Sequence, residues 1–98
     1  MKPQFSPDAA RVLDELERDP DKLNFTDAVW DTIDLITENS DSAAARRRAL
    51  RSVKGHSVWL VYVPLRYNED RWVILWQPRD DDALIAYIGP EDFGSSII

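Results

Sequence analysis

The strongest constraint on the fold is a change in hydrophobic period along the chain. Over residues 6–39 apolar residues recur at helical spacing, which is typical of amphipathic helices. Over residues 58–88 they form short β-branched and aromatic runs separated by turn residues, which is typical of strands. Helices followed by closely spaced strands predict an α+β fold, with N-terminal helices packed on one face of a three- to four-stranded antiparallel sheet. A chain of 98 residues is expected to form one domain, 1–98, with a frayed tail at 94–98.

Three helices are predicted before the strands. Ser6-Pro7-Asp8 supplies an N-cap, a proline at the first helical position and an acidic first turn, and Asp19-Pro20 ends this helix. A second helix is expected over 26–39 because its apolar residues form one stripe. A third, short and rich in Ala and Arg, is expected over 42–51.

The predicted strands are unusual because two of them are apolar on both faces. They cover 58–63, 72–76 and 83–88, and the first two lack the alternation of a half-exposed strand. The helices can cover only one face, so the other needs a partner chain, a second copy of this chain in a homodimer, or the tail at 89–98. The residues expected at a partner interface are Trp59, Val61, Trp72 and Trp76.

The charged residues are sorted into three blocks. Residues 1–44 carry four Lys and Arg against eleven Asp and Glu, a net charge of −7, and residues 80–98 carry five acidic residues and no basic ones. Residues 45–79 carry eight Lys and Arg against two acidic residues, a net charge of +6 in a chain whose net charge is −6. The candidates for binding nucleic acid or an acidic partner are Arg46, Arg47, Arg48 and Arg51. The alternatives are a solvated face or ion pairs with the acidic helices.

Few residues suit metal binding or conventional catalysis. His56 is the one histidine and could act as a general acid or base, or could be an ordinary surface histidine. Asp80-Asp81-Asp82 could hold a hard cation, but an Asp-rich hairpin turn also explains it. With no cysteine and no phosphate- or dinucleotide-binding motif, we expect neither a metal nor a cofactor. No apolar run is long enough to cross a bilayer, so we expect a cytoplasmic protein with no membrane partner.

Several short motifs, in order, resemble the RelE/ParE toxin superfamily of type II toxin–antitoxin modules. The resemblance covers about residues 5–93 and rests on these stretches: Phe5-Ser6-Pro7-Asp8-Ala9, Ala45-Arg46 with Leu50-Arg51, Lys54-Gly55, Val58-Trp59-Leu60-Val61, Asp70-Arg71-Trp72-Val73-Ile74 and Ala83-Leu84-Ile85-Ala86-Tyr87-Ile88-Gly89. It implies a small toxin that cuts mRNA on the ribosome or poisons DNA gyrase, and that a cognate antitoxin neutralises. The family's first strand is at best vestigial here, at Pro3-Gln4-Phe5.

The residues that the resemblance assigns to a ribonuclease site are Arg51, Lys54 and Arg71, with His56 as the available proton shuttle. Ribonuclease members carry basic residues where this chain has Leu60 and Tyr62, and they follow the last strand with basic residues and a tyrosine. Here Pro90, Glu91, Asp92 and Phe93 follow Gly89. Since positive charge stabilises the transition state of phosphodiester cleavage, the sequence leaves enzyme activity open. The alternatives are a non-catalytic RelE-like protein-binding module and a stand-alone nucleic-acid binder that uses arginines and tryptophans.

Overall fold

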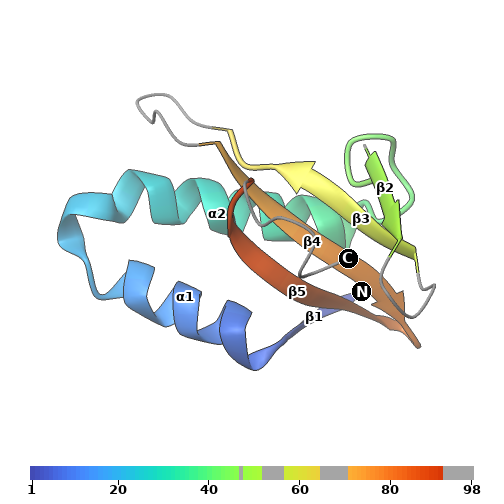
Figure 1. Ribbon diagram of the computed structural model, residues 1–98, viewed down its shortest axis with the longest axis horizontal. Helices are drawn as coiled ribbons and strands as arrows, with labels where there is room; N and C mark the ends of the chain where they lie inside the picture. The colour runs from blue at the N-terminus through green and yellow to red at the C-terminus, as the bar shows by residue number, and fades with distance from the viewer. Residues whose placement is uncertain (47, 52–56, 65–70, 92–98) are drawn as a thin grey trace.

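The computed structural model describes residues 1–46, 48–51, 57–64 and 71–91. These residues form two α-helices, a short 3-10 helix and a five-stranded sheet, which confirms the α+β class (Figure 1). In chain order the elements are β1 (Lys2–Phe5), α1 (Pro7–Glu17), η1 (Pro20–Lys22), α2 (Leu23–Glu38), β2 (Arg48–Arg51), β3 (Ser57–Tyr62), β4 (Trp72–Arg79) and β5 (Asp82–Pro90). The expected frayed tail, 94–98, lies outside the described residues.

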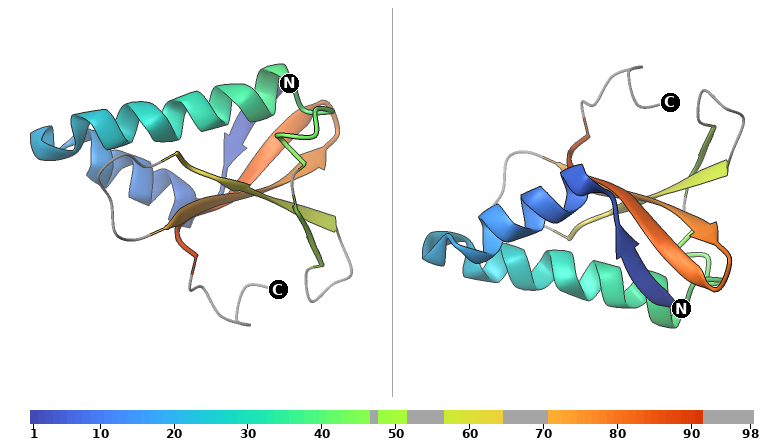
Figure 2. Two further views of the ribbon diagram at one scale, coloured as in Figure 1. Left: turned by 90° about the horizontal axis from the view of Figure 1, so that it is seen from above. Right: turned by 90° about the horizontal axis from the view of Figure 1, so that it is seen from below.

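The sheet differs from the prediction because it is mixed and has five strands. Its order is β1-β5-β4-β3-β2, and β1 pairs parallel with β5 while the other pairs are antiparallel. Figure 2 shows β1 running beside β5. The expectation of a vestigial first strand was wrong: Lys2–Phe5 is a short edge strand, a position where Pro3 costs no ladder bond.

Helix α1 begins as predicted, and its cap also ties the helix to the sheet. The Ser6 hydroxyl accepts a hydrogen bond from the Ala9 amide at 3.1 Å and donates one to the Ala86 carbonyl at 2.9 Å. The Ser6 amide donates to the Ile85 carbonyl at 3.0 Å. Ala86 is the extra residue of a β-bulge, because Leu75 pairs with Tyr87 while Trp76 pairs with Ile85. The bulge explains how Ile85 and Ile88 both face the core, although alternation alone would separate them.

Helix α2 begins three residues before the predicted start. The Thr26 hydroxyl donates to the Lys22 carbonyl at 2.8 Å, four residues back, so Thr26 lies inside the helix instead of capping it. No helix in the described part of the chain is long and apolar enough to cross a membrane.

The prediction of a third helix over 42–51 is wrong, because the described residues there make only one helical turn. The Ser42 hydroxyl accepts from the Ala45 amide at 3.1 Å, as a helix cap does, but Arg48–Arg51 then forms strand β2. In a continuing helix the Ala45 carbonyl would accept from the amide of Ala49. It accepts instead from the indole Nε1–H of Trp76 at 2.8 Å, and Ala49 pairs with Trp59. Tertiary pairing thus overrides the helix propensity of this segment.

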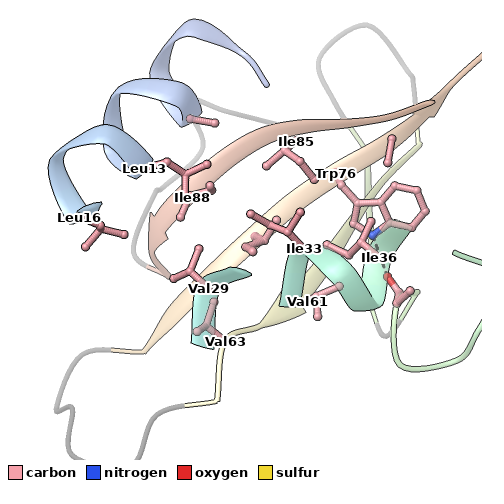
Figure 3. Close-up of a cluster of buried hydrophobic side chains, with 14 residues drawn as sticks. Leu13, Leu16, Val29, Ile33, Ile36, Val61, Val63, Trp76, Ile85 and Ile88 are labelled. Carbon is pink, nitrogen blue, oxygen red and sulfur yellow. Dashed lines mark hydrogen bonds between the residues drawn. The ribbon is translucent and has the colours of Figure 1, made fainter. Parts of the chain in front are cut away.

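The main core lies between the helices and one face of the sheet (Figure 3). Helix residues Leu13, Leu16, Val29, Ile33 and Ile36 pack against sheet residues Val61, Val63, Ile74, Trp76, Ile85 and Ile88. Burying each of these side chains contributes about 1.5–3 kcal/mol, so this interface dominates the stability of the fold.

The opposite face of the sheet carries a second apolar cluster of Val58, Leu60, Val73 and Leu75, with Tyr62 and Tyr87 packed against it. The prediction of strands that are apolar on both faces is therefore confirmed. These four residues are at most 7% exposed in the single chain, so this part of the second face is buried without a partner chain or a second copy. Much of the tail suggested as a cover, residues 92–98, lies outside the described residues.

Candidate functional site

The predicted catalytic residues are not gathered at one place by the described part of the chain. Lys54 and His56 lie outside the described residues. The backbone of Arg51 lies in β2 opposite Ser57, while Arg71 precedes β4 and its guanidinium lies over the ring of Tyr62. Ser57 and Tyr62 are the two ends of β3, about 17 Å apart at the usual rise per residue. Arg51 and Arg71 therefore belong to opposite ends of that strand.

Arg71 lies in a small cluster with Tyr62 and Glu91. Its guanidinium carbon is 5.5 Å from the centre of the Tyr62 ring, and its Nε is 4.0 Å from Glu91 Oε2. The Tyr62 hydroxyl donates a hydrogen bond to Glu91 Oε1 at 2.7 Å. The Tyr62 hydroxyl and the Arg71 guanidinium thus face one carboxylate, and a hydroxyl donor beside a cation is a pair of groups that binds anions.

The end of β5 holds Glu91 in this position. The Glu91 amide donates to the Arg71 carbonyl at 2.8 Å, and the Tyr87 hydroxyl donates to the Pro90 carbonyl at 2.8 Å. Gly89 leaves room for the Tyr87 ring in this position, because a Cβ atom at residue 89 would lie 2.7 Å from the Tyr87 hydroxyl oxygen. Both polar groups of the peptide that joins Pro90 to Glu91 are therefore hydrogen-bonded, and these bonds hold the backbone that carries Glu91.

Sequence analysis did not predict this cluster. Tyr62 and Glu91 are 29 residues apart and meet only because β3, β4 and β5 are neighbours in the sheet. The available signal was the alternation of β3, which places Tyr62 on the same face as Leu60, away from the helices.

Arg46, predicted to bind phosphate or an acidic partner, has a packing role in the structure. Its guanidinium carbon lies 5.2 Å from the Trp59 ring centre and 5.6 Å from that of Trp76. Its Nε donates to the Ser40 carbonyl at 2.7 Å, and one terminal nitrogen donates to Asp41 at 3.3 Å. These contacts hold the turn before β2 against the sheet. They leave Arg46 with little free surface for a ligand, since its side chain is 31% exposed.

The remaining predicted binding arginines are described less fully. Arg47 lies outside the described residues, and Arg48 is described as a β2 backbone position opposite Leu60.

The predicted partner interface is divided between the core and the surface. Val61 and Trp76 are 4% and 0% exposed in the helix-covered core, so they are inaccessible to a partner of this form of the chain. Trp59 and Trp72 are half-buried at the edge of the same core. They are the members of the predicted interface that retain accessible surface.

The acidic turn behaves as a hairpin connection. Asp80 and Asp81 join β4 to β5, and Asp80 adopts a left-handed backbone with φ of 56°, which aspartate tolerates well. Asp82 accepts a hydrogen bond from the Gln4 side chain, so it links β5 to β1. Among the described residues there is no group of acidic or histidine side chains that could hold a metal ion.

Comparisons with protein-family models, curated proteins and solved structures found no match for this chain. These comparisons therefore contribute nothing to the functional interpretation.

Proposed function

We propose that this chain is the toxin-like component of a type II toxin–antitoxin module of the RelE/ParE kind, bound and neutralised by a cognate antitoxin. We further propose that it acts by contacting a protein target, as a gyrase poison does, and not by cleaving mRNA. The order of elements supports the family assignment, because a short first strand and two helices precede the remaining strands of one sheet. The first strand that the sequence barely indicated is present as β1.

The observation that carries the choice of mechanism is the Glu91 carboxylate beside Arg71. A nuclease stabilises the negative charge that develops on the scissile phosphate with cations. Arg71 is the one predicted catalytic residue whose side chain is described, and an anion already faces it at 4.0 Å. A chain of net charge −6 also approaches ribosomal RNA against electrostatic repulsion.

The test is induction of this chain in bacteria, with and without the product of the neighbouring gene. We expect growth arrest that the neighbour relieves, with cellular mRNAs intact by primer extension. Cleaved mRNA in the arrested cells would refute the protein-contact mechanism. The Arg51→Ala/Arg71→Ala double variant provides a second readout: a nuclease would lose its toxicity, whereas we expect this variant to arrest growth as the wild type does.

The second candidate is a non-catalytic RelE-like module that binds a protein partner without toxicity. The paired state of Arg71 and the overall acidity of the chain favour it as well. Normal growth with abundant soluble protein, together with co-purification of the neighbouring gene product, would establish this candidate and reject the toxin.

A further inference from the structure

The Tyr62–Arg71–Glu91 cluster has the composition of an occupied anion site. Two groups that bind anions, a phenol hydroxyl and a guanidinium, face one carboxylate at 2.7 Å and 4.0 Å. The anion that occupies this site is the carboxylate of Glu91, which belongs to the same chain. The guanidinium is also positioned over the Tyr62 ring, which limits the directions in which it can approach a ligand.

The backbone of Glu91 is held by its own hydrogen bonds, while its carboxylate is held by one hydrogen bond from Tyr62 and a long contact to Arg71. The Glu91 amide and the neighbouring Pro90 carbonyl each make a hydrogen bond of 2.8 Å. By contrast, the Arg71 side chain is 71% exposed, and its 4.0 Å separation from Glu91 is at the limit of an ion pair. Exposed ion pairs of this kind add little stability, so the contact with Arg71 contributes little to holding the Glu91 side chain. The main hold on the carboxylate is the 2.7 Å hydrogen bond from the Tyr62 hydroxyl, which a phosphate oxygen can accept in its place.

We infer that Tyr62 and Arg71 form a latent phosphate-binding site and that Glu91 is its built-in competitor. A phosphate offers a guanidinium two oxygens at once and leaves a third for the tyrosine hydroxyl. A tethered carboxylate acts at an effective concentration in the millimolar range, so it competes with phosphate ligands that are more dilute. Displacing or neutralising Glu91 opens the site.

Phosphate, and not the carboxylate of an acidic protein, is the ligand class that fits. An external carboxylate would repeat the interactions that Glu91 already provides and would gain nothing to offset its loss of free motion. A phosphate adds a further acceptor oxygen and, as a monoester, more charge. This inference rests on the same Arg71–Glu91 pair as the choice of mechanism above, but it concerns phosphate binding and not cleavage, so the binding test and the growth test can fail separately.

The experiment compares wild-type protein with the Glu91→Gln variant. Glutamine keeps an oxygen that can accept from Tyr62 but removes the charge that faces Arg71. Binding is measured at low salt for inorganic phosphate, by NMR titration, and for a labelled single-stranded oligoribonucleotide, by fluorescence anisotropy. We expect Glu91→Gln to bind about fivefold more tightly than wild type, the factor that corresponds to the upper range for an exposed ion pair.

Two matched variants separate this effect from a general change in charge. Glu15→Gln removes the same charge from an exposed position of α1 and should bind as the wild type does. The Glu91→Gln/Arg71→Gln double variant should lose the gain. A gain for both ligands assigns the site to the phosphate group itself, and a gain for the oligoribonucleotide alone assigns it to an RNA strand. No gain for either ligand, or a gain that survives in the double variant or appears in Glu15→Gln, would overturn the inference.

Discussion

Arg46 and Arg71 make the same aromatic contact on opposite faces of the β3–β4 hairpin, but with different consequences. Arg46 lies 5.2 Å from the ring centre of Trp59 on the helix-covered face, and Arg71 lies 5.5 Å from that of Tyr62 on the other. The Arg46 Nε donates to a backbone carbonyl at 2.7 Å, whereas Arg71 faces a side-chain carboxylate at 4.0 Å. A guanidinium bonded to a nearby backbone carbonyl is committed to the fold, whereas one that faces a side-chain carboxylate at 4.0 Å has an acceptor that another anion can replace. The two arginines thus differ in their hydrogen-bond partners and not in their ring contacts.

The largest effect is expected at Trp76, one of the two rings that Arg46 contacts. We expect Trp76→Phe to lower the free energy of unfolding by about 3 kcal/mol, because a buried carbonyl loses its donor and a smaller ring leaves a void. Urea unfolding followed by far-UV circular dichroism measures the change. Trp59→Phe, at a half-buried ring, is the control and should cost about 1 kcal/mol. Equal losses for the two variants would mean that the bond from Trp76 to Ala45 contributes nothing.

A smaller effect is expected from Arg46→Lys. The substitution keeps the positive charge near both indole rings but removes the Nε–H that donates to Ser40. Loss of one such bond should cost about 1 kcal/mol and lower the melting temperature by roughly 4–8 °C. Thermal unfolding at two ionic strengths checks this. A melting temperature within about 1 °C of wild type would be a much smaller shift than expected. It would mean that Arg46 belongs to a solvated face, which is one of the alternatives that the sequence left open for the basic block.

The smallest effect is expected from Arg71→Gln. Since the Arg71 side chain is 71% exposed and its ion pair is long, the free energy of unfolding should change by less than about 0.5 kcal/mol. The same urea titration used for Trp76→Phe measures it. A loss as large as that of Arg46→Lys would show that the two arginines are equivalent in stabilising the fold, and the contrast between them would fail.

Local chemistry made much of the fold predictable. The Ser6-Pro7 start of α1, the stop at Pro20 and the strand runs around Trp59, Trp76 and Ile85 depend on neighbours in sequence, and the structure confirms them. The misassigned elements depend on distant partners. Arg48–Arg51 has helix-forming residues but pairs with β3, and Lys2–Phe5 becomes a strand only beside β5.

The candidate site was less predictable than the fold. Arg71 was identified from the resemblance, and Glu91 was noted where ribonuclease members carry basic residues, but nothing in the sequence indicated that the two would meet. Arg46 was grouped with its basic neighbours because charge in a sequence carries no information on hydrogen-bond acceptors. The Ser40 carbonyl and the two tryptophan rings that hold it become visible only in three dimensions.

The parallel pairing of β1 with β5 also imposes an order in time on the folding of this protein. Ser6, directly after β1, bonds to Ala86 across a sequence separation of 80 residues. At ordinary rates of translation, the ribosome takes about 4–16 s to make that intervening length of chain. Until then β1 and the cap of α1 have no strand to join, and contacts of such long range also slow folding in general. β1 and the cap of α1 are therefore synthesised well before the strand that completes them, and we expect them to be among the last parts of the described fold to become native.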